Sequence, residues 1–208
     1  EEFAYAYAVR KGIKKPELYA KWANLIGKPS WDLAGSRSIR LLLFNKGQTF
    51  MPDGSVGSED FINDFPDMEF GKGMLYEFRD SDHIDKDLQM AEEANKTAQI
   101  INDPELIFES ESVLGATKLV KSLKEFSDAR KMENARKSPI LEKALNEIDS
   151  AAKSITKNLY LWGMVTNPQT KDGHPSRFYD TVTSAQHAAS MAWEYGVKSG
   201  IIDKESWA

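Results

Sequence analysis

His83 is the residue with the clearest chemical potential, because it lies among the carboxylates of the segment from Arg79 to Asp87. Imidazole and carboxylate groups bind divalent cations and transfer protons, so the cluster invites a metal hypothesis. A calcium loop of the helix-loop-helix type requires glycine at its sixth position and glutamate at its twelfth. Counted from Asp80, these positions hold Asp85 and Ala91. The spacing therefore favours acidic residues that stabilise the N-terminus of a helix, and we expect no metal and no cofactor.

Known catalytic and cofactor-binding motifs are missing from the sequence. With no cysteine and three histidines, the chain has no thiolate nucleophile and too few imidazoles for a histidine-rich metal centre. It contains no Gly-x-Ser-x-Gly motif, and no glycine-rich segment has the residue order of a phosphate-binding loop. If the chain does bind a small ligand or catalyse a reaction, polar residues on loops are the first candidates. They are Asp80, Asp82, His83, His174 and Arg177.

A basic stretch is the best candidate for a contact with nucleic acid. Lys118, Lys121 and Lys124 step by three, which groups them on one surface of a predicted helix. Acidic residues interleave with them, so an ordinary solvated helix face is the simpler interpretation. The alternative is a face that binds single-stranded nucleic acid. Its residues would be Lys118, Lys121, Lys124, Arg130, Lys131, Arg136 and Lys137.

Aromatic residues near the C-terminal end favour an interface. The last predicted helix contains four alanines between residues 185 and 192, which permit another backbone to approach closely. Trp193, Tyr195 and Trp207 lie beside these alanines, and tryptophan and tyrosine are enriched in protein interfaces. Tight packing within the chain and contact with a partner explain the pattern equally well.

The charge of the chain is distributed unevenly. The net charge of −5 argues against a dedicated binder of duplex DNA. Residues 1–45 hold eight basic and four acidic side chains, residues 46–112 hold five and seventeen, and residues 113–208 hold fourteen and eleven. These counts give +4, −12 and +3, so the acidic middle can attract the basic flanks of the same molecule or of a neighbouring copy.

The two ends of the sequence give little information on location. Because the chain begins with Glu1 and not with methionine, we expect that a preceding segment was removed or left out. No apolar run reaches the roughly 18–20 residues that a membrane-spanning helix needs. The sequence therefore predicts no membrane span and makes no prediction about the cellular compartment.

The elements that would position these groups are mainly helices. The segment from Phe3 to Arg10 predicts a short helix that ends at Gly12. Pro16 suits the first turn of a second helix, whose apolar face includes Trp22. Gly27 is the predicted end of this second helix.

Residues 45–81 differ in character from the rest of the chain. Glycine and proline recur among aromatic and acidic residues, and Pro52-Asp53-Gly54 has the composition of a hairpin turn between Phe50 and Val56. We predict an irregular acidic lobe that contains a small β-hairpin.

After residue 82 the pattern is helical almost to the end. Asp103 and Pro104 predict the start of one helix, and Ser138 and Pro139 predict the start of another. The second of these carries an apolar repeat at steps of four and three: Leu141, Leu145, Ile148, Ala152, Ile155, Leu159 and Trp162. Residues 163–175 are predicted as a loop, followed by a last helix that ends near Gly200.

These patterns predict a mainly α protein with one domain. Short connections favour an up-down bundle of about four helices over residues 82–200, within a bundle region of 82–208. Short helices over residues 1–44 and the irregular lobe over 45–81 would cover one end of it. The leading hypothesis is a non-enzymatic protein that binds a protein partner or self-associates, such as a viral or phage nucleoprotein or coat subunit. The alternative is an enzyme or ligand-binding domain with its site between the 45–81 lobe and the 163–177 loop.

Overall fold

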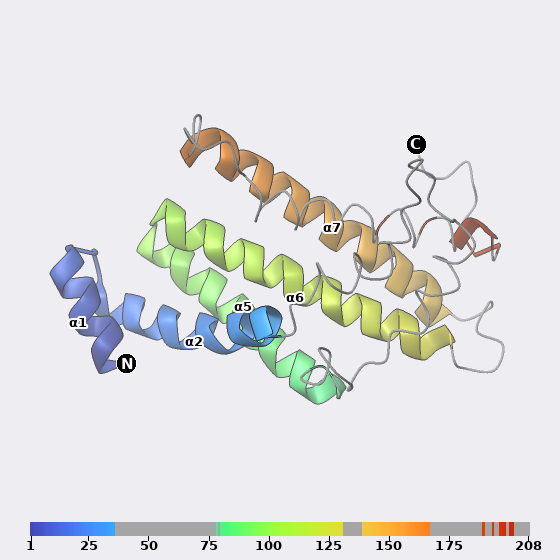
Figure 1. Cartoon of the computed structure of the whole chain (residues 1–208), viewed down its shortest axis with the longest axis horizontal. Helices are drawn as coiled ribbons and strands as arrows, with labels where there is room; N and C mark the ends of the chain where they lie inside the picture. The colour runs from blue at the N-terminus through green and yellow to red at the C-terminus, as the bar shows by residue number, and fades with distance from the viewer. Residues whose placement is uncertain are drawn as a thin grey trace, which may run out of the picture.

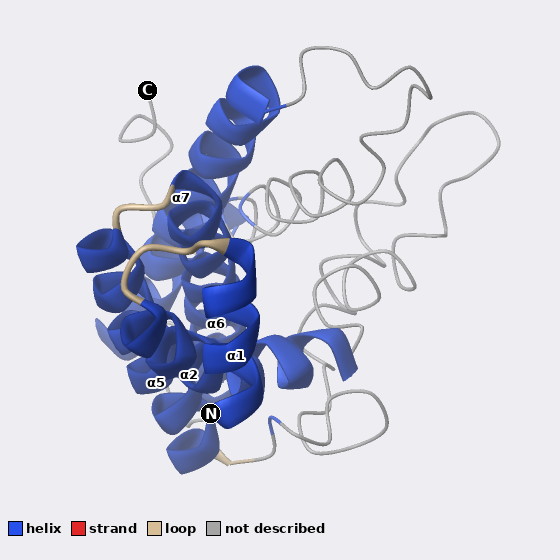
Figure 2. Ribbon diagram, turned by 90° about the vertical axis from the view of Figure 1, so that its left-hand side faces the viewer, coloured by secondary structure: helices blue, strands red, loops and turns tan. Residues whose placement is uncertain are grey.

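The structure is a computed structural model, and it describes residues 1–35, 78, 80–130, 139–166, 189, 193, 196–198 and 200–201. Among these residues the chain is helical and contains no strand, which confirms a mainly α fold (Figure 2). The helices are α1 (Glu2–Lys11), α2 (Pro16–Gly35), α5 (Ser81–Ile101), α6 (Pro104–Arg130) and α7 (Pro139–Thr166). The predicted hairpin within residues 45–81 lies outside the described residues.

Helices α5, α6 and α7 lie side by side, with α6 in the middle (Figure 1). Two residues, Asn102 and Asp103, join α5 to α6, so these helices are antiparallel. Asn102 adopts the left-handed conformation at the end of α5, with a φ of 62°. Asp103 Oδ1 then accepts hydrogen bonds from backbone amides in the first turn of α6, at 2.9 and 3.3 Å. The predicted helix boundary at this position is confirmed.

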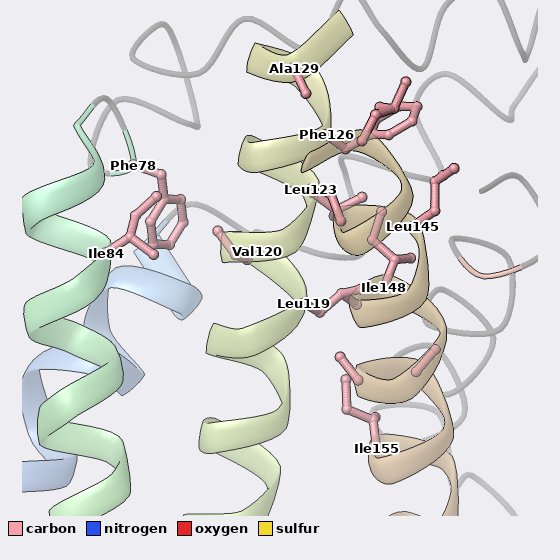
Figure 3. Close-up of a cluster of buried hydrophobic side chains, with 14 residues drawn as sticks. Phe78, Ile84, Leu119, Val120, Leu123, Phe126, Ala129, Leu145, Ile148 and Ile155 are labelled. Atoms are coloured by element: carbon pink, nitrogen blue, oxygen red, sulfur yellow. The ribbon is translucent and has the colours of Figure 1, made fainter. Parts of the chain in front are cut away.

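The main core lies between α6 and α7. The repeat of α7 is buried from Leu141 to Ile155, with Ile148 completely inaccessible to solvent. Figure 3 shows these side chains facing Leu119, Leu123 and Phe126 of α6. The repeat therefore forms a helix–helix core from Leu141 to Ile155, as its spacing predicts, while the side chains of Leu159 and Trp162 lie outside the described residues.

A second cluster attaches α2 to α5 and α6. Trp22 and Ile26 of α2 pack with Ala94 and Ala98 of α5. The Trp22 indole Nε1 also donates a hydrogen bond of 2.7 Å to the Ser110 hydroxyl on α6, which in turn donates to a backbone carbonyl. A buried indole whose N–H is bonded in this way fixes the rotation of α2 about its axis and its position along that axis.

Two predicted helix ends are wrong. Helix α2 does not stop at Gly27 but continues through Pro29 to Gly35. No positive φ is recorded at Gly27, and the burial of Ile26 just before it and of Asp32 just after it keeps this stretch packed as helix. Helix α7 likewise includes Gly163 and extends to Thr166, so residues 163–166 are helix and not loop; residues 167–175 lie outside the described residues. Glycine in a helix costs only about 1 kcal/mol, which tertiary packing can offset.

Other ends agree with the sequence. Gly12 follows α1 with a left-handed φ of 68°, as expected. Gly200 has the same φ, and its amide donates back to Val197, so the last helix ends where predicted. Most of that last helix lies outside the described residues, and the count of four bundle helices stays a prediction. No helix in the described part of the chain is long and apolar enough to span a membrane.

Candidate functional site

Three side chains that can bind a cation or exchange a proton meet between α2 and α5. His83 and Asp87 lie one turn apart on α5, and Asp32 reaches them from α2. One ligand atom from each residue lies within 4.8 Å of the other two. We call Asp32, His83 and Asp87 the Asp-His-Asp cluster. It is the one group of this kind among the described residues.

Local structure explains why these residues meet. Asp80 precedes α5 in an extended conformation, and its carboxylate accepts a hydrogen bond of 2.7 Å from the His83 backbone amide. This N-cap places His83 in the first turn, with Asp87 on the same face. The continuation of α2 beyond Gly27 carries Asp32 to that face.

The contacts inside the cluster are unequal. His83 Nε2 makes a hydrogen bond of 2.7 Å with Asp32 Oδ2 but lies 3.6 Å from Asp87 Oδ2, which is too long for a hydrogen bond. Asp87 is only 3% exposed, and its Oδ2 is buried with no hydrogen-bond partner in the described part of the chain. Buried carboxylate oxygens normally have partners, so this one marks an unfilled coordination or hydrogen-bonding position.

A lysine supplies the positive charge beside the cluster. Lys28, one turn before Asp32 on α2, places its Nζ on Asp32 Oδ2, the same oxygen that His83 contacts. Asp32 is 1% exposed, whereas the Lys28 side chain is about half exposed. The lysine can therefore leave the site for solvent without moving the helix.

The two carboxylates respond oppositely to this environment. Burial, followed by the neighbouring Asp32 carboxylate, raises the pKa of Asp87 to about 6. Burial also acts to raise the pKa of Asp32, but hydrogen bonds with Lys28, His83 and the Asp87 carboxyl group outweigh it, and the pKa of Asp32 is lowered. Among the described lysines, Lys28 is the one that pairs with a carboxylate of the cluster.

The distances suit a small cation. Around an ion with metal–ligand distances of about 2.0–2.2 Å, two ligands at the tetrahedral angle lie roughly 3.3 Å apart. His83 Nε2 lies 2.7 Å from Asp32 Oδ2 and 3.6 Å from Asp87 Oδ2, one distance below this value and one above it. Small side-chain rotations would therefore place an ion between the three groups. The two carboxylates offer ligand atoms within 4.8 Å of each other.

The structure brings one of the five predicted loop-site residues into the cluster. His83 belongs to it, and Asp80 supports it as the N-cap of α5. Asp82 is exposed in the first turn, outside the cluster. His174 and Arg177 lie outside the described residues, so their participation in a ligand-binding or catalytic site stays a prediction.

The predicted basic face is largely neutralised where it is described. Lys118 is exposed, Lys121 pairs with Asp85 of α5 and with Glu125 at 3.1 Å, and Lys124 pairs with Asp128 at 2.6 Å. The hydrogen bond that Lys121 donates to Asp85 raises the pKa of Lys121, against the effect of burial. The side chains of Arg130, Lys131, Arg136 and Lys137 lie outside the described residues.

The predicted aromatic interface is described at one position only. Trp193 is partly buried, while Tyr195 and Trp207 lie outside the described residues. The described structure offers a different set of exposed aromatics on α1, where Phe3 is 85% exposed and Tyr5 and Tyr7 are also exposed.

Sequence reasoning missed Asp32 and Asp87 as site residues. The spacing of His83 and Asp87 by four on a helix was visible in the sequence and would have placed them on one face. Asp32 gave no such signal, because it lies 51 residues before His83 and beyond the predicted end of its helix.

The comparisons with known proteins leave this geometry as the guide to function: the chain matches no family model, no curated protein and no solved structure.

Proposed function

We propose that this chain is a helical binding protein whose Asp-His-Asp cluster holds a divalent transition-metal ion between α2 and α5. The observation that carries the proposal is the buried Asp87 carboxylate oxygen with no partner, 3.6 Å from His83 Nε2. An ion bound to Asp32, His83 and Asp87 would give that oxygen a partner and balance the two negative charges.

An ordinary ion-pair network explains only part of the cluster. The contacts among Lys28, Asp32 and His83 would join α2 to α5 without a metal. A protonated Asp87 can share a hydrogen bond with Asp32, but an ionised Asp87 stays buried beside a second carboxylate, at an energetic cost of about 1–3 kcal/mol. A purely structural network would be more stable with an uncharged residue at position 87. The presence of a second buried acid favours a site for a cation.

The ligand set selects the class of ion. One imidazole and two carboxylates suit zinc, cobalt, iron or manganese, whereas calcium and magnesium prefer oxygen ligands alone. Three protein ligands also leave at least one position for water on a tetrahedral ion. We therefore expect a zinc-like ion with water as its fourth ligand.

Calorimetric titration of the chelator-treated protein tests the proposal. We expect one Zn²⁺ or Co²⁺ per chain, with Ca²⁺ and Mg²⁺ binding much more weakly. The Co²⁺ complex should show the absorption bands of a four- or five-coordinate site. Zn²⁺ should also raise the melting temperature in proportion to the logarithm of its concentration above the dissociation constant.

Matched variants separate the cluster from its acidic surroundings. His83→Gln and Asp87→Asn should each weaken Zn²⁺ binding by roughly tenfold or more, because each removes one of three ligands. Asp82→Asn is the control, since Asp82 lies on the same turn but is exposed outside the cluster. Unchanged binding in the two cluster variants, or an equal loss in the Asp82 variant, would overturn the proposal.

Self-association is a second candidate function, supported by α1. Phe3, Tyr5 and Val9 are exposed there, at 85%, 43% and 55%. A second copy of the chain is the proposed partner of this surface, because the basic residues at the end of α1 complement the strongly acidic segment 46–112.

Binding of single-stranded nucleic acid by the basic face stays a prediction with less support, since Lys121 and Lys124 are already ion-paired.

Light scattering tests this second candidate. Wild-type protein should gain mass with rising concentration and lose it with added salt, because the proposed contact is partly electrostatic. Phe3→Ser should weaken the association, while Ile140→Ser, at an exposed position on α7, is the control. A monomer at every concentration would exclude self-association without affecting the metal proposal.

A further inference from the structure

A trough over α6, on residues separate from the Asp-His-Asp cluster, forms a second candidate site. Its larger hollow has a volume of about 440 Å³ and is lined by Asn95 of α5, Lys118 of α6 and Lys157 of α7, among others. A neighbouring hollow of about 340 Å³ shares Lys118 and Ser154 with it. Volumes of this size suit small organic molecules.

The floor of the trough depends on a close approach of α6 and α7. Gly115 lines the larger hollow, and a Cβ atom built there would lie only 2.8 Å from Ile155 Cγ1. The missing side chain allows the two helices to come together below the hollow. Ser154 and Lys157 of α7 thereby line the same hollow as Lys118 of α6.

The lysines of this face divide into two groups. Helices α6 and α7 carry six lysines, and four of them pair with a carboxylate one turn away: Lys121, Lys124, Lys143 and Lys153. The other two, Lys118 and Lys157, form no ion pair with any described residue, and both line the larger hollow. Unpaired ammonium groups therefore gather at the hollow, while the surrounding charges are satisfied.

Polar groups suited to a bound molecule complete the wall. The side-chain amide of Asn95 has a buried oxygen with no hydrogen-bond partner among the described residues. This oxygen can accept a hydrogen bond from a bound molecule. Ser154 adds a hydroxyl group to the lining, and Glu111 adds an acceptor.

We infer that the trough binds a small organic anion, whose carboxylate or phosphate group lies between Lys118 and Lys157. The ammonium groups supply charge-assisted hydrogen bonds to the anionic group. Asn95, Ser154 and Glu111 meet hydroxyl or amide groups elsewhere on the molecule. This binding goes beyond the proposed metal function, because the two sites have no residue in common.

Titrations with succinate and with inorganic phosphate test the inference and distinguish the two kinds of anionic group. Amide shifts in ¹H–¹⁵N spectra should move saturably at residues of the trough, with sodium chloride of equal ionic strength as the reference. Succinate binding alone would assign a carboxylate ligand, and phosphate binding alone would assign a phosphate ligand. Either result supports the inference.

Lysine variants decide whether the trough is specific. Lys118→Gln and Lys157→Gln should each weaken binding by about tenfold, and both side chains are exposed, so folding should be unaffected. Lys143→Gln and Lys153→Gln are matched controls on α7, with expected changes below about twofold. Shifts that do not saturate with either anion, or an equal loss in the controls, would overturn the inference.

Discussion

His83 Nε2 and Asp32 Oδ2 form a hydrogen bond of 2.7 Å that joins α5 to α2 across 51 residues of sequence. Lys28 binds the same carboxylate oxygen, so Asp32 is satisfied twice, while Asp87 beside it is not satisfied at its Oδ2. The predictions for pH, zinc and Asp87 follow from this difference in hydrogen bonding between two neighbouring buried acids.

The stability of the metal-free protein should fall as the pH rises through about 6. Burial raises the pKa of Asp87 to about 6 from an ordinary value of 3.8, so the folded state favours the protonated acid. The associated stability is fully present below about pH 4 and is lost as Asp87 ionises, up to about 3 kcal/mol. Asp32, whose pKa is lowered, acts oppositely and loses its contribution only in more acidic solution. Urea unfolding between pH 4 and 8, with a chelator present, measures the slope.

Zinc should reverse this pH dependence. A bound ion needs the ionised form of Asp87, so the stability gained from zinc should grow as the pH rises through the same range. If the pH dependence is identical with and without zinc, Asp87 is not a ligand. Melting temperatures at fixed free zinc concentration provide the comparison.

Asp87→Asn should stabilise the metal-free protein above pH 6 while it weakens metal binding. Asparagine has nearly the same shape but no charge to bury, so we expect a gain of about 1–3 kcal/mol in the free energy of unfolding. The pH dependence near 6 should also disappear. Asp82→Asn should change stability by only a few tenths of a kcal/mol, because that residue is exposed in the first turn of α5. A loss of stability in the Asp87 variant would show that the acid serves the fold and not a ligand.

The predictability of the helices and of the site differs for physical reasons. The repeat from Leu141 to Ile155 and the cap at Asp103 depend on residues close in sequence, and both are confirmed. The end of α2 was predicted wrongly, because Gly27 and Pro29 favour a stop locally while contacts with α5 keep the helix intact. The cluster shares this long-range origin, since Asp32 reaches His83 only through the longer α2.

Lys28→Met should tighten zinc binding by about three- to tenfold. The Lys28 ammonium group competes for Asp32 Oδ2, so its removal frees a ligand atom before the ion arrives. The same change should lower the stability of the metal-free protein by about 1 kcal/mol, because two acids then lack a nearby positive charge. Calorimetry with zinc and urea unfolding without it provide the two measurements.

Lys21→Met is the matched control for the Lys28 variant. Lys21 also joins α2 to α5, through a 2.8 Å ion pair with Glu93, but it lies away from the cluster and both partners are largely exposed. Zinc affinity should therefore be unchanged. A similar gain in affinity in both variants would mean that Lys28 acts only through the overall charge of the protein.

Gly115→Ala should destabilise the protein although alanine is the better helix former. The intrinsic preference for helix favours alanine by about 1 kcal/mol. The added Cβ would lie 2.8 Å from Ile155 Cγ1, a branch close to the backbone of α7 that cannot rotate away freely. Forcing the helices apart in a packed core costs about 1–3 kcal/mol, so we expect a net loss measurable by urea unfolding. In an Ile155→Ala background, which lacks Cγ1, the same Gly115→Ala change should cost much less. If the single variant is instead more stable than the wild type, α6 and α7 do not approach as closely as described, and the floor of the trough is deeper than the structure shows.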